Sequence, residues 1–598
     1  MPATPFWIPH SRCSSNIGVY ILTAEWQLLM ERGTSAVNDR SNATLDSSEV
    51  IAPPIVRHLR QILLWPLQVM PADPRAAAPS RYWDLFDPRH PESRWRELEK
   101  TFGEHPAAFR ERYYKEFVTF LPYVQRFLYG EVPGEDTTTG YGLSPIRVFR
   151  RDDITHVRMT FDEHTPPVTF AVETVDLYFF YDADIVILLV EIASDELPLR
   201  LAQQALFSFG RAYPAFWDAS GQGGQCVRLV EWLAADGRTL AASDYADRDK
   251  YLTFLSRHHT PVIARHWEWL LRPMSLYHSG RPGVLRYRQI EYHRMPLMAY
   301  LAFDEPRNLT RGDFVRLALI TKPGDAATLP YSAASLADFE RLYCYDRFWE
   351  PLVNPSPLNS RYLCCGHAFV IVGKANDPFF IDGETGMLGQ FRHQYLLMGI
   401  VAHFHKAALH LFSERLVSAI SRLDTHQRQS VRTFKRDIRH IMAAFLRFTH
   451  RYWFHEVSNQ AQARDLFNLM TGHLGTDRLY NDINDAVREM SEFLEADDMR
   501  RQAETVTRLT VVTTLSIIGT VATSFLGMNL IDAAEEPLWV KIAYFAVVFA
   551  VFALIVFFTV SKSTALAESF EVIANERASA EAKLVALVRA LTWRLRKR

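Results

Sequence analysis

Two long apolar runs near the C-terminal end constrain this chain more than any other feature. Leu509–Leu526 holds 18 residues without a charge, and Ile542–Val560 holds 19 more. At about 1.5 Å of rise per residue, each run makes a helix roughly 27–29 Å long, which is close to the hydrocarbon thickness of a bilayer. The link between them is too short to fold alone. The sequence therefore predicts a transmembrane hairpin, with helices over 506–528 and 539–560 and about 500 residues on one side of the membrane.

The two runs differ in polarity. The second is apolar all round, as expected of a helix that faces lipid. The first carries small and hydroxyl residues at intervals of three and four, so that they share one helix face. This hydroxyl stripe consists of Thr513, Ser516, Thr520 and Thr523, and Gly527 continues it. Such a face packs closely on another helix or lines water, and the stripe alone leaves both open.

A tripeptide, Gly527-Met528-Asn529, stands at the outer end of the first run. At this place it resembles the signature of the CorA family of magnesium channels. The resemblance rests on the last hundred or so residues and extends to the rest only in general layout. It implies a homopentamer in which five copies of the first helix surround a pore, with a ring of Asn529 at the external mouth. We therefore expect a CorA-like fold, in which an α+β cytoplasmic domain precedes a long helical stalk and the two-helix hairpin.

The chemistry of Asn529 suits a hydrated cation. Magnesium dehydrates reluctantly and usually keeps several waters. Neutral carbonyl oxygens accept hydrogen bonds from those waters without holding the ion too tightly to leave, as conduction requires. The hydroxyls of Thr520 and Thr513 can act in the same way deeper in the pathway.

Other residues of this helix have predicted roles in shaping the pathway. Leu509 and Ile517 lie on or beside the hydroxyl stripe and would form dry constrictions. Gly527 would allow a sharp turn where the helix ends. Met528 is expected to pack rather than to bind the ion, because a soft thioether suits a hard cation poorly.

Flanking charge predicts the orientation in the membrane. The link over 529–538 carries Asp532, Glu535 and Glu536 and no basic residue. Ser561–Arg598 carries eight basic and four acidic residues, a net of +4. Since Lys and Arg mark the cytoplasmic side, both termini are expected inside a multi-pass cell-membrane protein, with the link outside. The three acids either concentrate cations at the mouth or belong to a solvated turn.

The rest of the chain suggests three parts before the membrane. Residues 1–150 read as a mainly helical extension, with a short helix over 55–70 broken by Pro66. An α+β domain is expected over 151–390 and a helical stalk over 391–505, whose helices cover 391–422, 426–455 and a stretch from near Thr476 into the membrane. Residues 561–598 read as a basic amphipathic tail that lies on the inner leaflet or packs on the stalk. Strands are expected at Val157–Phe161, Val168–Val172, Leu177–Tyr181, Ile185–Ile192, Ala368–Gly373 and Phe379–Asp382.

Four carboxylates in the last long helix follow one another at intervals of three and four. This acidic stripe consists of Asp482, Asp485, Glu489 and Glu492. It is either a solvated face or, as the resemblance implies, a regulatory site that binds Mg²⁺ between subunits and holds the pore closed.

Composition and motifs narrow the function further. A net charge of −2 gives no indication of a nucleic-acid partner, and five scattered cysteines suit a reduced compartment. No cleavable signal peptide, nucleophile motif or HExxH pair is apparent, so we expect neither an enzyme nor a prosthetic group. His403 and His410 can share a helix face, but no Cys or carboxylate completes a metal site there. The expected partners are a divalent cation, the bilayer and further copies of the chain. Alternatives are a zinc, cobalt or nickel transporter of the same fold, or a membrane-anchored binding or regulatory protein.

Overall fold

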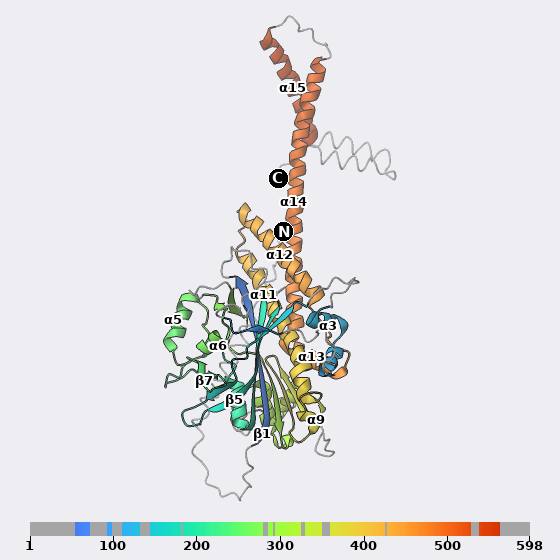
Figure 1. Cartoon of the computed structure of the whole chain (residues 1–598). Coiled ribbons are helices and arrows are strands. Elements are labelled where there is room, and N and C mark those ends of the chain that lie inside the picture. The colour runs from blue at the N-terminus through green and yellow to red at the C-terminus, as the bar shows by residue number, and fades with distance from the viewer. Residues whose placement is uncertain are drawn as a thin grey trace, which may run out of the picture. The chain divides into compact units, whose positions relative to one another are not determined.

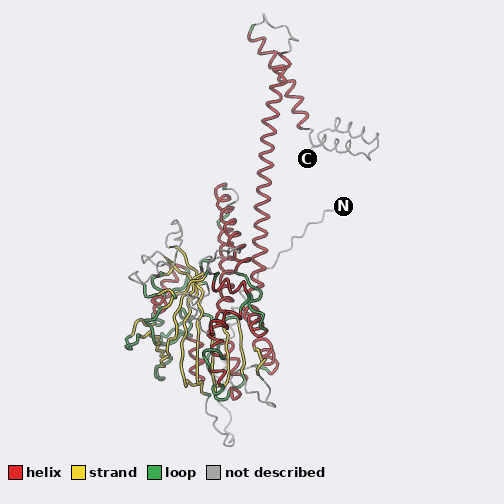
Figure 2. Tube along the Cα trace, turned by 45° about the vertical axis from the view of Figure 1, so that its right-hand side comes forward, coloured by secondary structure: helices red, strands yellow, loops and turns green. Residues whose placement is uncertain are grey.

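The computed structural model describes residues 54–71, 86, 93–98, 111–131, 144–180, 183–278, 285–290, 293–324, 329, 331–349, 359–424, 427–527 and 537–561. The chain divides into two compact units, Met1–Pro54 and Ile55–Arg598, and all elements below belong to the second. This unit is a mixed α and β structure with a large sheet and many helices (Figures 1 and 2).

A mostly antiparallel sheet of 14 strands forms the scaffold, and its main path runs β12-β13-β14-β11-β1-β6-β5-β4-β7-β8. Strand β11 pairs in parallel with β14, while β1 is antiparallel to β6, β10 and β11. The strands are β1 (Ile55–Pro71), β2 (Arg96–Glu97), β3 (Ile146–Arg150), β4 (His156–Thr160), β5 (Val168–Phe180), β6 (Ile185–Pro198), β7 (Leu229–Leu233), β8 (Thr239–Ala242), β9 (Ser275–Leu276), β10 (Leu285–Gln289), β11 (Leu297–Phe303), β12 (Cys344–Phe348), β13 (Ser360–Cys365) and β14 (Ala368–Lys374).

The helix predicted over 55–70 is wrong, because this segment is β1, a central strand of the sheet. The prediction treated Pro66 as a break in a helix, whereas the residue lies inside a strand, where proline is rare because it cannot donate to a ladder. On one edge Pro66 is opposite Ile187 of β6. On the other edge, pairing with β11 ends at Leu63 and pairing with β10 begins at Leu67. Pro66 thus occupies the gap between two partner strands, where a missing N–H costs little.

The sheet is covered on both faces, so its central strands send apolar side chains into a core on each face. In β1, Leu63, Trp65 and Leu67 enter one core, while Ile62 and Leu64 enter the other, as the period of two requires. The first core contains residues of α4 (Leu199–Ser208), α6 (Arg265–Leu270) and α7 (Arg311–Leu319). The second contains residues of α3 (Pro122–Tyr129) and of the later helices, and Figure 1 shows α6 and α3 on opposite sides of the sheet.

The helical half follows the sequence predictions closely. A π-helical turn, η5 (Phe391–Tyr395), leads into α11 (Leu396–Ser421), which is followed by α12 (Arg428–Arg451), α13 (Ala461–Leu474) and α14 (Thr476–Gly527). The predicted start of the last helix near Thr476 is confirmed, and α13 is an addition. The second apolar run lies in α15 (Leu538–Ser561). The remaining helices are α2 (Glu111–Thr119), α5 (Arg248–His258), η3 (Pro306–Asn308), α8 (Ala333–Tyr343), α9 (Pro378–Ile381) and α10 (Met387–Gln390).

The strand predicted at Phe379–Asp382 is also wrong, because the segment belongs to the short helix α9. The side chain of Asp377 accepts a hydrogen bond from the backbone N–H of Phe379, and Pro378 occupies the first helical position. An Asp cap followed by Pro is a helix-start signal, and it outweighs the β propensity of the two phenylalanines. The strand predicted at Ala368–Gly373 is confirmed as β14.

We expect Phe404→Ala to be among the most destabilising single changes in this unit. Phe404 is fully buried in α11 and stacks on Phe180 of β5, with 4.3 Å between ring centroids. It therefore fixes the helical half on the sheet. Removing a buried Phe ring costs about 3–5 kcal/mol, which should appear as a lower unfolding midpoint of the purified protein. Leu255→Ala, at an exposed site of α5, is the control and should change stability by less than about 0.5 kcal/mol. Equal effects of both changes would contradict this account.

Candidate ion pathway and stalk

Helices α14 and α15 pack through one face of the first apolar run. Ile518 and Ala522 of α14 are buried, and Phe525 makes an edge-to-face contact with Phe552 of α15 at 6.1 Å between centroids. By helical spacing, these residues lie on the side of α14 opposite the hydroxyl stripe. The hairpin contact therefore uses the apolar face.

The hydroxyl stripe points away from α15. Thr513, Ser516, Thr520 and Thr523 are all exposed. The Oγ1–H groups of Thr513, Thr520 and Thr523 donate to the carbonyl oxygens four residues earlier, at 2.9–3.0 Å. The helix thereby satisfies these hydroxyl protons, and each oxygen keeps a lone pair that can accept a hydrogen bond. The face thus presents acceptor oxygens to whatever covers it.

The predicted constrictions lie on the same side. Leu509 is 62% exposed and Ile517 is 58% exposed, so neither is covered by α15. Gly527 is the last residue of α14, and its φ lies outside the left-handed region. The sharp turn predicted after it falls outside the described residues. A Cβ at Gly527 would meet nothing within 4 Å in one chain. Met528, Asn529, Asp532, Glu535 and Glu536 lie outside the described residues, as does the tail over 562–598.

Within the described part of the chain, two helices are long and apolar enough to cross a membrane. Met387–Ser421, which includes α11, is mostly buried in the protein core and covers the sheet. Leu538–Phe557 of α15 has no buried residue in its most apolar window. Leu538 and Trp539 are each more than 70% exposed, and large exposed apolar surfaces are typical of sites that contact a membrane or another protein. Ser516–Phe525 of α14 is a shorter apolar stretch.

The acidic stripe covers the outer face of the stalk. All four of its carboxylates are exposed, whereas Ile483 and Leu494 of the same helix are buried against the second core. Glu492 has an ion pair with Arg488 at 3.4 Å, one turn earlier. Among the described residues, no group of three or more His, Cys, Asp and Glu side chains is placed to hold a metal ion. One copy of the stripe therefore does not form a complete ligand set.

A lysine that the sequence analysis did not single out fastens α12 to the stalk. Lys435 is 6% exposed, and its Nζ lies 2.5 Å from Asp497 and 2.6 Å from Asp498. Burial lowers the pKa of Lys435, but the hydrogen bonds and charges of the two aspartates outweigh burial and raise it. The hydrogen bond from Lys435 also lowers the pKa of Asp498. The signal for this contact was a lysine on the apolar side of an amphipathic helix.

The histidines of α11 do not form a metal site in the described structure. His405 is fully buried, and its Nε2 lies 2.6 Å from the carbonyl oxygen of Tyr452. Burial lowers its pKa to about 3, so His405 is a neutral core residue. His403 is buried and His410 is exposed, so the two do not share an environment.

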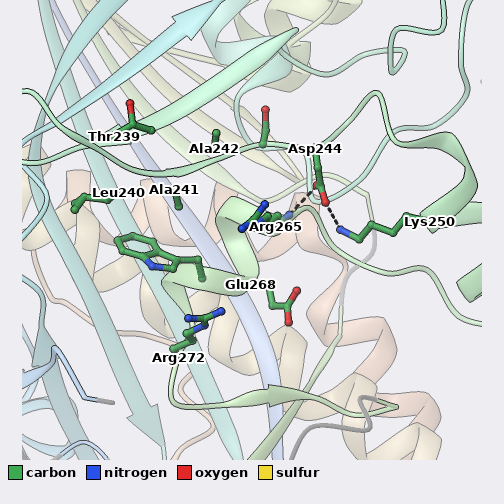
Figure 3. A pocket seen from close by; sticks show the side chains of 11 residues that line it. Thr239, Leu240, Ala241, Ala242, Asp244, Lys250, Arg265, Glu268 and Arg272 are labelled. Carbon is green, nitrogen blue, oxygen red and sulfur yellow. Dashed lines mark hydrogen bonds and ion pairs between the residues drawn. The ribbon is translucent and has the colours of Figure 1, made fainter. Parts of the chain in front are cut away.

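A pocket of about 750 Å³ lies between β8 and α6 (Figure 3). Its lining residues fall within 239–272, far in sequence from the hydroxyl stripe of α14. Asp244 accepts hydrogen bonds from Lys250, from the hydroxyl of Tyr251 and from the backbone N–H of Arg265. Burial raises the pKa of Asp244, but the hydrogen bond from Lys250 and the other contacts outweigh it and lower the pKa. These charges are satisfied within the protein and fix the loop after β8 to α5 and α6.

Comparisons with protein-family models, curated proteins and solved structures give no match.

We expect Lys435→Met to loosen α12 from α14, because two aspartates lose a shared, buried partner. The expected loss is about 1–2 kcal/mol of local stability, and faster amide hydrogen exchange in α12 would reveal it. Lys435→Arg keeps the charge and should retain most of the protection. Because the pKa of Asp498 is lowered, its contribution is present above the ordinary value of 3.8 and disappears as pH falls through the folded-state pKa. Unchanged exchange in Lys435→Met would contradict a fastening role.

Proposed function

We propose that this chain is a subunit of a homo-oligomeric, CorA-like channel that admits divalent cations, magnesium above all, through the cell membrane. Both termini lie in the cytoplasm, and the link over 529–538 lies outside. The transported ion is the only metal the proposal requires, and the oligomer is expected to be a pentamer. A transporter of zinc, cobalt or nickel is the alternative of the same fold.

The observation that supports this proposal best is the direction of the hydroxyl stripe. The hairpin partner α15 covers Ile518 and Ala522, whereas the hydroxyl oxygens lie on the opposite side of α14. Lipid cannot hydrogen-bond to those oxygens, so water or further copies of the chain suit this face better. A helix that served only as an anchor would need no polar face. Several copies of α14 with this face inward would enclose a path lined by acceptor oxygens.

In the proposed path, rings of hydrogen-bond acceptors alternate with rings of apolar side chains. Thr513 and Thr520 would offer acceptors to the waters around the ion, and Asn529 would do so at the mouth. Leu509 and Ile517 would form narrow apolar rings between or below them, which gate by excluding water. This arrangement passes an ion that keeps its inner waters, as magnesium does.

A regulatory role for the acidic stripe stays a prediction that depends on assembly. Its carboxylates extend over three helical turns of one chain and do not converge there. A neighbouring copy would have to complete any site for Mg²⁺.

Asn529→Ala should abolish or greatly reduce magnesium flux into liposomes while leaving assembly intact, because the mouth loses its acceptors for hydrated ions. Asn481→Ala, at an exposed position of the stalk, is the matched control and should conduct normally. Normal flux in a correctly assembled Asn529→Ala protein would exclude this residue as a selectivity element.

Thr520→Val should have a milder effect, because it keeps the shape and removes only the hydroxyl. Losing one hydrogen bond of about 0.5–1.5 kcal/mol should lower flux by roughly two- to tenfold. Flux assays with Mg²⁺, Zn²⁺, Co²⁺ and Ni²⁺ on the same liposomes identify the preferred ion. If the unmodified protein inserts correctly yet passes no divalent cation, the membrane-anchored alternative replaces the channel.

A further inference from the structure

Helix α12 carries an unusual amount of positive charge on its exposed side. Its 24 residues include seven Lys and Arg against one Asp, a net of +6. Buried Phe434, Ile438 and Phe445 define the side that packs on the core. The opposite side is exposed and presents arginines at intervals of three, four and eight residues, which on a helix fall in one row. We call this row the basic face; it consists of Arg432, Arg436, Arg439 and Arg447.

The stalk carries the opposite charge at the same level. Residues 476–499 of α14 include eight Asp and Glu against two Arg, a net of −6. Helices α12 and α14 lie side by side and antiparallel, as two ring contacts along their length establish (Figures 1 and 2). Phe434 lies 6.0 Å from Phe493, and Phe445 lies 5.7 Å from Tyr480, centroid to centroid. The basic face and the acidic stripe therefore occupy the same stretch along the stalk.

Within one chain the two charged surfaces cannot meet. α14 turns its buried residues, Ile483 and Leu494, toward the core that includes α12, and the acidic stripe points the other way. Within the described part of the chain, the ion pairs between the two helices join Lys435 and Arg439 to Asp497 and Asp498, which lie outside the acidic stripe. The Arg436 side chain is 77% exposed and forms a 3.4 Å ion pair with the adjacent Asp437. The complementary surfaces thus remain exposed on different sides of one protomer.

We propose that the basic face of α12 docks against the acidic stripe of α14 in the next copy of the chain. This inference rests on the oligomeric channel proposed above and names the contact between its subunits. A contact between two different surfaces of identical chains is heterologous and closes into a ring when the rotation allows it. If the copies are related by a rotation axis parallel to α14, a residue of one copy faces residues at the same level along that axis in the next copy. The ring contacts between α12 and α14 place Arg436 at the level of Glu489 and Glu492. Opposite charges also fix the register and reject like-charged pairings.

Two other occupants fit these surfaces less well. A layer of anionic lipid headgroups would contact one end of α12, whereas the basic face extends along the stalk for several turns. A magnesium ion on the acidic stripe would need further carboxylates from a neighbour, whereas the surface at the right level offers guanidinium groups. The occupant that matches in sign, length and position is another copy of this chain.

Cysteine cross-linking in the full-length protein tests the contact directly. With Arg436→Cys and Glu492→Cys in the same chain, a short thiol-specific cross-linker should join neighbouring copies into ladders up to the full ring. The matched control pairs Glu492→Cys with Arg257→Cys, an exposed arginine of α5, and should give only the background of the unmodified protein. Ladders no stronger than the control would overturn the proposal.

Charge reversal tests whether the attraction matters. Glu489→Arg with Glu492→Arg, or Arg432→Glu with Arg436→Glu, should each weaken stalk association in detergent by roughly tenfold, with a smaller effect at high salt. All four changes together should restore association, because the signs match again, and Arg257→Glu should change nothing. Failure of the quadruple variant to recover, with both double variants folded, would contradict the docking.

The same samples separate the competing accounts. If magnesium occupies the stripe, association should require Mg²⁺ and ignore Arg432 and Arg436. If lipid occupies the basic face, the arginine variants should lose binding to anionic vesicles while the glutamate variants associate normally. Either result overturns the proposal. Flux is measured separately, so a conducting protein without this contact refutes the contact alone, and a docked ring that passes no cation refutes the channel alone.

Discussion

The pairing of β1 with β6 is the interaction on which the rest of the structure depends. It extends from Ile55 to Gln68, and it joins the strands β11, β13 and β14 on one side to β4, β5 and β7 on the other. Because β1 is also covered on both faces, it enters both hydrophobic cores. A segment from the N-terminal part of the chain thus holds together elements that follow it by hundreds of residues. Without β1 the sheet would separate into two pieces with open edges.

The second hydrophobic core connects the sheet to the stalk helix α14. Helix α11 lies against the sheet, and α12, α13 and the first turns of α14 pack on α11. The stacked rings of Trp453 and Tyr480, 4.7 Å apart, fix the base of α14 to the same cluster. Since α14 continues as one helix from Thr476 to Gly527, a rotation or shift at its base is carried to the first apolar run. In the proposed channel, a helical stalk of this kind would give the sheet-bearing part of the chain mechanical control over the path.

The sequence predicted the helical half better than the sheet, for a physical reason. Helix signals are local, so the start of α14 near Thr476 and the approximate limits of α11 and α12 could be predicted from the sequence. The segment 55–71 can form a central strand because Pro66 falls between the ends of β11 and β10. That arrangement involves residues distant in the chain, so no local sequence pattern predicts it. The face of α14 that carries hydroxyls was readable from spacing, and the structure adds which side α15 covers. The fastening by Lys435 and the basic face of α12 needed the packing of two helices distant in the chain.

The hydroxyl stripe and the acidic stripe of α14 point in different directions, and this difference limits which of them can line an ion path. At about 100° per residue, the mean direction of the acidic stripe lies roughly 140° from that of the hydroxyl stripe along a straight helix. If the hydroxyls face the axis of an assembly, the acids therefore face the sides or the outside of the ring. The acidic stripe is then poorly placed to extend the ion path toward the cytoplasm. It is well placed to meet a neighbour, and α12 presents the charge that such a neighbour must carry.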